Sequence, residues 1–193
     1  VNFIEQNYPD LLDHLSTAKS PMQMFGAVVK TYYAEKSGIN PADIVSVAIM
    51  PCTAKKAEAV RPEMNASGYQ DVDFVLTTRE LGRMIKEAGI DFEQLPSENF
   101  DDPLGESTGA AVIFGASGGV MEAALRTVAE VLTGQELAEL EYHEVRGLEG
   151  IKEAVIPIGD LTVKVAVVHS LVNARIIMEK VRNGEANYHF IEI

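Results

Sequence analysis

The chain has 193 residues, of which 47% are hydrophobic, and a formal net charge of −13 at pH 7. This length is enough for one domain or two small lobes, and the acidic balance argues against binding to nucleic acid or to anionic membrane surfaces. A single cysteine excludes an internal disulfide, and no apolar run approaches the ~18 residues that would cross a bilayer.

Helices and strands alternate in the first half of the chain. Ser20 followed by Pro21, with Gln23 at the capping-box position, marks the start of a helix that stops at Gly38. The sequence Thr77-Thr78-Arg79-Glu80 caps another helix, which ends at Gly89. The remaining elements predicted here are a short amphipathic helix at about 9–16 and strands at 44–49 and 72–76.

The same alternation continues after an acidic, irregular stretch at 90–108. A strand is predicted at 110–114, and a glycine-rich turn at 115–119 leads from it into a helix at 120–132. Strands at 155–158 and 163–168 flank a Gly159-Asp160 turn, and a helix at about 173–182 and a strand at 188–193 follow. The repeated order predicts an α/β protein with two lobes, each with a small, mainly parallel sheet flanked by helices, and an active-site cleft between the lobes.

Cys52 is the only cysteine and follows the apolar run at 44–49. Pro51 suits the first position of a helix, which would place Cys52 in the first helical turn, where free N–H groups and the helix dipole favour a thiolate. Lys55 lies about one turn further on, on the same side. The pattern indicates a reactive nucleophile or a metal ligand, and an equally good alternative is a small buried hydrophobic side chain. One thiolate cannot hold an iron–sulfur cluster alone.

The glycine-rich turn at 115–119 has two interpretations. A turn between a strand and a helix can bind phosphate, because exposed N–H groups at a helix start attract anions. However, the turn lacks both a G-x-G-x-x-G pattern and a lysine–serine ending. A tight turn that needs a positive φ is therefore favoured over a nucleotide site.

Three stretches together resemble the catalytic domain of FeFe (iron-only) hydrogenases over essentially the whole chain. Met50-Pro51-Cys52-Thr53-Ala54-Lys55-Lys56 with Glu58 is similar to the second cysteine signature of that family. The stretch at 114–126, Phe-Gly-Ala-Ser-Gly-Gly-Val-Met-Glu-Ala-Ala-Leu-Arg, resembles another typical segment. The stretch at 169–175 is weakly similar. Because the first and third cysteine signatures of the family are missing, residues 1–193 are expected to be an internal fragment of the catalytic domain, inactive on its own.

The resemblance implies a cofactor and site residues. Its members hold a 4Fe-4S cubane, bridged to a di-iron centre that carries CO, cyanide and dithiolate ligands, the assembly called the H-cluster. By this resemblance Cys52 is one cubane ligand, Lys55 donates to a cyanide, and Ser16 belongs to a proton relay. The residues that resemble those packed around the di-iron centre are Pro21, Met50, Pro51 and Phe114.

The resemblance also implies reversible oxidation of H2, with protons and H2 as substrates and ferredoxin or NAD-linked subunits as redox partners, in the cytoplasm and without membrane insertion. One alternative is a hydrogenase-like iron–sulfur protein without this activity, such as a cytosolic cluster-assembly factor or a sensor. Another is a non-catalytic Rossmann-like module that uses the turn at 115–119, which a nucleotide titration would reveal.

Overall fold

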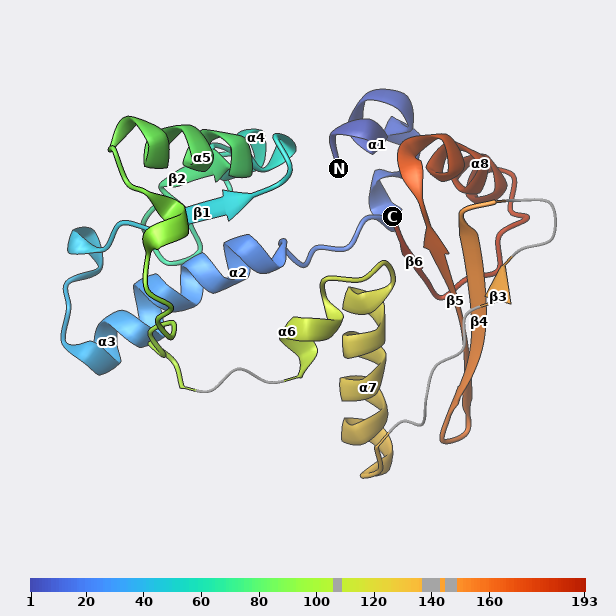
Figure 1. Cartoon of the computed structure of the whole chain (residues 1–193). Helices are drawn as coiled ribbons and strands as arrows, with labels where there is room; N and C mark the ends of the chain where they lie inside the picture. The colour runs from blue at the N-terminus through green and yellow to red at the C-terminus, as the bar shows by residue number, and fades with distance from the viewer. Residues whose placement is uncertain (106–108, 137–142, 145–148) are drawn as a thin grey trace. The chain divides into compact units, whose positions relative to one another are not determined.

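The computed structural model describes residues 1–105, 109–136, 143–144 and 149–193. The chain divides into two compact units, which are described separately (Figure 1). The first unit combines residues 1–15 with residues 106–193, and the second unit contains residues 16–105.

The second unit is built on two parallel strands, β1 (Val47–Met50) and β2 (Phe74–Thr77). Val47 pairs with Phe74 at one end and Met50 pairs with Thr77 at the other, so both strands end at the same edge. Parallel neighbours need a long connection between them, and α4 (Ala54–Ala59) lies in this one. The predicted strands at 44–49 and 72–76 are thus confirmed, but each strand begins later than predicted, at Val47 and at Phe74.

A long helical segment precedes the sheet and consists of α2 (Pro21–Val28), a π-helical turn η2 (Val29–Tyr33) and α3 (Ala34–Ser37). Its predicted ends are confirmed: the Ser20 hydroxyl accepts a hydrogen bond from the Gln23 amide at 3.4 Å, and Gly38 ends the segment with a φ of 65°. The predicted capping box is wrong. The Gln23 side chain is fully buried, and its side-chain nitrogen and oxygen form no hydrogen bond within the described part of the chain.

The helix after β2 is α5 (Thr78–Glu87), and here the predicted capping box is present. Thr77 accepts from the Glu80 amide at 3.2 Å, while the Glu80 carboxylate accepts from the Thr77 amide at 2.8 Å. Two short 3-10 segments complete the second unit, η3 (Pro41–Asp43) and η4 (Phe92–Gln94). Part of the stretch expected to be irregular, residues 106–108, lies outside the described residues.

The core of the second unit lies between α2, α4 and the sheet. It contains the buried side chains of Met22, Ala59, Val72 and Val75, with Ala48 and Met50 packed against them. Gly26 allows α2 to approach closely, since a Cβ at this position would lie 2.4 Å from the carbonyl oxygen of Asp71. The helix that follows Ser20 is therefore fixed against the segment that leads into β2.

The first unit contains a four-stranded sheet in the order β3-β4-β5-β6. Its strands are β3 (His143–Glu144), β4 (Ile151–Ile158), β5 (Leu161–Val168) and β6 (Phe190–Glu192). Only β5 and β6 are parallel, and the other two pairs are antiparallel. The α/β class and the small sheets are confirmed, but this sheet is mixed rather than mainly parallel, because the Gly159-Asp160 turn folds β4 and β5 into a hairpin.

Within the described residues of the first unit, five helical segments accompany this sheet. The predicted strand at 110–114 is wrong: the segment forms the helix α6, and Val112 is 83% exposed. A short apolar run does not distinguish a strand from a helix by periodicity, and alanine favours the helix. The segments are α1 (Asn2–Asn7), η1 (Pro9–His14), α6 (Ala110–Ile113), α7 (Gly119–Thr133) and α8 (Ser170–Arg182).

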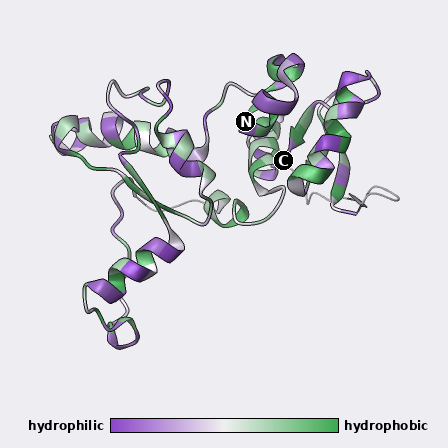
Figure 2. Cartoon of the chain, turned by 90° about the horizontal axis from the view of Figure 1, so that it is seen from above, coloured by the Kyte–Doolittle hydropathy of each residue, from purple (hydrophilic) through white to green (hydrophobic). Residues whose placement is uncertain are grey.

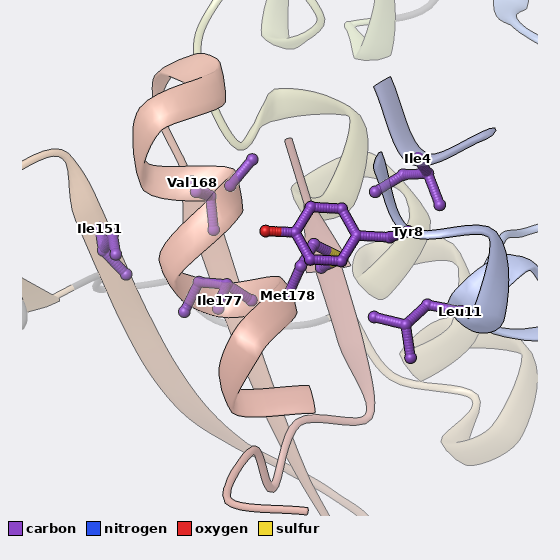
Figure 3. Close-up of a cluster of buried hydrophobic side chains, with 9 residues drawn as sticks. Ile4, Tyr8, Leu11, Ile151, Val168, Ile177 and Met178 are labelled. Carbon is purple, nitrogen blue, oxygen red and sulfur yellow. The ribbon is translucent and has the colours of Figure 1, made fainter. Parts of the chain in front are cut away.

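Two clusters of buried side chains hold the first unit together. In one, Ile4, Tyr8 and Leu11 from the N-terminal segment pack against Ile177 and Met178 of α8 (Figure 3). In the other, α7 packs on β4 and β5 through Met121, Leu125 and Ala129. Figure 2 shows hydrophobic and hydrophilic bands side by side on the helices, as expected for helices with one buried face.

Candidate functional site

Cys52 lies in the second unit, between the end of β1 and the start of α4. The helix begins at Ala54 with Thr53 at the N-cap, so Cys52 is two residues before the helix and Pro51 is not its first residue. The prediction that Cys52 occupies the first helical turn is therefore wrong. The thiol is exposed, which removes the alternative of a small buried hydrophobic side chain.

The parallel pairing of β1 and β2 determines where Cys52 lies. Because Met50 pairs with Thr77, both strands end at one edge, and the helices α4 and α5 both begin beyond it. Ligands of open α/β sheets bind beyond the carboxyl ends of the strands. The exposed thiol of Cys52 thus occupies the edge of the sheet at which this architecture places ligands.

Two neighbouring lysines follow Cys52 and have different partners. The Lys55 ammonium contacts the carboxylate of Glu58 at 2.6 Å, one turn further along α4. The Lys56 ammonium contacts Glu80 of the α5 capping box, also at 2.6 Å. The hydrogen bond from Lys56, together with those from Thr77, lowers the pKa of Glu80 from 4.5 to about 2. Lys56 therefore joins the starts of α4 and α5, whereas the contact of Lys55 stays within α4.

Two further predicted site residues also lie in the second unit. Ser16 is exposed, and its hydroxyl accepts a hydrogen bond from the Ala18 amide at 3.2 Å, which leaves its own proton free to be donated. Pro21 is the exposed first residue of α2. Phe114 directly follows α6 in the first unit and is 40% exposed. Its expected role at the same centre remains a prediction.

Met50 lines an apolar cavity of about 280 Å³ between α2 and β1. Its half-buried side chain also packs against the core that contains Met22, the residue after Pro21. The structure thus places Met50 beside the start of α2. The lining residues are Met22, Phe25, Gly26, Val29, Val45, Ser46, Val47, Ala48, Met50 and Val72.

The glycine-rich turn at 115–119 is already bound to an anion of the protein itself. The Glu192 carboxylate in β6 accepts hydrogen bonds from the amides of Gly118, at 2.9 Å, and Met121, at 2.8 Å. Gly118 has the expected positive φ, 83°, and Ser117 contacts His169 at 2.5 Å. Since the carboxylate fills the start of α7, these findings favour the tight-turn interpretation over a nucleotide site.

The number of metal-binding side chains in this chain limits how many ligands of a metal cofactor it can supply. A 4Fe-4S cluster is bound by four thiolates, and this chain has one. Within the described ranges, no group of three or more His, Cys, Asp or Glu side chains is placed to hold a metal ion. Cys52 therefore fits the role of one cluster ligand within a larger set.

Sequence reasoning missed two acidic residues that the structure brings into these sites. Glu58 was part of the quoted signature, but its pairing with Lys55 was not predicted, although the spacing of three residues allows it. Glu192 lies 71 residues from Met121 in sequence, and no local sequence pattern predicts the contact between them.

Among the helices that the structure describes, none is both long and apolar enough to cross a bilayer.

Comparison with known proteins identifies relatives over the whole chain. The subunit HndD of an NADP-reducing hydrogenase from Solidesulfovibrio fructosivorans is 51% identical over 193 residues, which are 100% of this chain and 33% of that protein. The large subunit of the periplasmic Fe hydrogenase from Nitratidesulfovibrio vulgaris is 52% identical over 98% of this chain and 45% of its own length. The chain therefore spans a third to about half of these relatives.

A more distant relative and a solved structure extend the comparison. Cytosolic iron-sulfur assembly component 3 of Mus musculus is 32% identical over 95% of this chain and 40% of its own length. A structure of the FeFe hydrogenase HydA1 from Chlamydomonas reinhardtii matches 99% of this chain and 56% of that chain, with a TM-score of 0.80 and 41% identity. The family model for the C-terminal domain of the iron-only hydrogenase large subunit matches residues 1–193. The chain belongs to this family of iron-only hydrogenase domains.

Proposed function

We propose that this chain forms part of the catalytic domain of an FeFe hydrogenase that interconverts H2 with protons and electrons. The observation that carries the proposal is the exposed Cys52 thiol beyond the ends of β1 and β2, with a lysine three residues later. Relatives about 50% identical over nearly the whole chain are named hydrogenases, which supports the proposal.

In this proposal Cys52 supplies one of the four thiolates that hold a 4Fe-4S cubane, and the other three come from outside this chain. When the di-iron centre is bound, Lys55 would donate to one of its cyanide ligands, because an ammonium is a strong donor to an anionic ligand. When bound, the H-cluster supplies the redox chemistry of proton reduction. The side chains of Pro21, Met50 and Pro51 would exclude water around the bound cofactor, and by the family resemblance Phe114 would do the same.

Ser16 is proposed to pass protons towards the centre. Its hydroxyl is exposed, and the hydrogen bond from the Ala18 amide uses only one of its two lone pairs, so the second lone pair can accept a proton from a donor while the hydroxyl donates its own. Ferredoxin or an NAD-linked subunit would exchange electrons with the centre, and the name of the Solidesulfovibrio relative, an NADP-reducing hydrogenase subunit, is consistent with a nicotinamide-linked partner.

A cytoplasmic location is part of the proposal, although the Nitratidesulfovibrio relative is named periplasmic. Fractionation of the source cells, followed by immunodetection of the protein, tests it. Recovery in the periplasmic fraction would contradict this part and leave the chemistry untouched.

The test of function uses a full-length protein that contains this segment, matured anaerobically. We expect H2 evolution with a reduced viologen dye, and Lys55→Asn should lower both activity and the occupancy of the di-iron centre while the cubane remains. Lys56→Asn is the matched control, because Lys56 contacts Glu80 in another helix. A full-length protein that binds clusters but neither evolves nor consumes H2 would favour the assembly-factor or sensor alternative. Unchanged activity and occupancy in Lys55→Asn would contradict the role of Lys55.

A further inference from the structure

The ion pair between Lys55 and Glu58 lies next to the candidate site and joins two residues of the same helix, α4. The distance from the Lys55 ammonium to the Glu58 carboxylate is 2.6 Å, and their side chains are 28% and 19% exposed. The neighbouring Lys56 has a different arrangement, because its partner Glu80 belongs to the start of α5. Lys56 therefore links two helices, whereas Lys55 and Glu58 link only residues of one helix.

The order of the two charges in α4 is the less favourable of the two possible orders for the helix itself. Lys55 lies in the first turn, where the positive end of the helix dipole repels a cation. An acidic residue N-terminal to a basic one stabilises a helix better than the reverse order that is found here. Helix stability alone would thus favour the reverse order, with the glutamate first and the lysine one turn later.

We propose that Glu58 is a positioning residue that holds the Lys55 ammonium for an anionic ligand bound at the Cys52 edge. This inference rests on the proposed function and extends it by one residue. A lysine side chain has a flexible four-carbon stem and samples many rotamers, so a carboxylate at 2.6 Å restricts where its ammonium lies. An ammonium has three donors, and the carboxylate can be satisfied by one, which leaves donors for the ligand.

Glu58 also balances charge at the site. A half-buried ammonium with a carboxylate partner is compensated before the anionic ligand arrives, and the ligand then meets an oriented donor rather than a mobile one. Without Glu58 the side chain of Lys55 would gain freedom and turn towards solvent. The ligand would then bind less tightly, even though the lysine itself remained.

The first test uses the 193-residue chain without cofactor. Glu58→Gln should raise the rate at which Lys55 is reductively methylated several-fold, as followed by peptide mass spectrometry, and leave Lys56 unchanged. Glu80→Gln is the matched control and should raise the rate for Lys56 only, since Glu80 contacts that lysine. An unchanged Lys55 rate in Glu58→Gln would overturn the inference.

The second test uses the full-length matured protein and measures infrared bands of the cyanide ligands together with the iron content. Glu58→Gln should shift or broaden the cyanide bands and lower di-iron occupancy at least twofold, with the cubane retained, and Glu58→Asp should restore part of both. Wild-type bands and occupancy in Glu58→Gln, with a clear defect in Lys55→Asn, would refute the positioning role and leave the proposed function standing. If Lys55→Asn is also unaffected, the proposed role of Lys55 fails, and that of Glu58 fails with it.

Discussion

The buried ion pair between Lys30 and Asp73 anchors the strand that leads to Cys52. Lys30, in the π-helical turn η2, is only 3% exposed, while Asp73 is 25% exposed and lies just before β2. The Lys30 ammonium contacts the carboxylate at 2.6 Å and donates to the Gln70 carbonyl at 2.7 Å. The same carboxylate accepts from the Ser46 amide at 2.7 Å, immediately before β1. One carboxylate therefore connects η2 to the starts of both strands.

The two partners should respond differently to removal because their burial differs. Asp73→Asn leaves the buried Lys30 ammonium without a compensating charge, because the amide oxygen that replaces the carboxylate oxygen is neutral, and we expect the free energy of unfolding of the second unit to fall by about 3–5 kcal/mol. Lys30→Met keeps the volume of the stem and leaves a carboxylate that is partly solvated and still bound to Ser46, so about 1–2 kcal/mol should be lost. The double variant should be more stable than Asp73→Asn alone, because no buried charge remains unpaired.

Urea unfolding of the 193-residue chain measures these changes, and hydrogen exchange of peptides from residues 44–50 assigns them to the second unit. The control is Asp10→Asn, which breaks an exposed ion pair with Arg182 in the first unit and should have a much smaller effect. A loss in Lys30→Met equal to or larger than that in Asp73→Asn would refute the reasoning from burial. So would losses that are negligible in both variants.

Three further predictions concern pH and backbone packing. The pKa of Glu80 is lowered to about 2, so the stabilisation that it provides is complete above pH 4.5 and is lost as the pH falls towards 2. Acid titration of unfolding should show this loss, and Glu80→Gln should make it smaller. Burial and a hydrogen bond to Glu153 raise the pKa of Tyr188 to about 12, so stability should fall between pH 10 and 12 in the wild type and fall less in Tyr188→Phe. Gly119→Ala would place a Cβ 1.8 Å from the Ile113 carbonyl oxygen and should lower the melting temperature. Gly82→Ala, in open space within α5, should not lower it, and equal melting temperatures in both variants would contradict the close packing at Gly119.

Short sequence patterns predicted the starts of helices well. The start of α2 at Pro21 and the capping box of α5 depend on residues within one turn of each other, so the sequence alone identifies them. The helix α6 was mistaken for a strand, because four apolar residues fit both structures. Gln23 did not complete a capping box, because burial of its side chain prevailed over the local pattern.

The candidate site was predicted as far as its residues are neighbours in sequence. Cys52, Lys55 and Glu58 fall within seven positions, and the family signature identifies this stretch as functional. The common edge at which Met50 and Thr77 end is a property of strand pairing, which the strand–helix order indicated only in outline. The contact of Glu192 with the start of α7 joins segments that are remote in sequence, so only the three-dimensional structure reveals it.

Iron content and electron paramagnetic resonance after anaerobic reconstitution test most directly whether Cys52 supplies a thiolate to a cubane. In a full-length protein containing this segment, Cys52→Ala should lose about four irons and the signal of one cluster relative to the wild type. The 193-residue chain, with a single thiolate, should bind no stable cluster. Full iron content and an unchanged spectrum in Cys52→Ala, or a stoichiometric cubane on the monomeric 193-residue chain, would contradict the account.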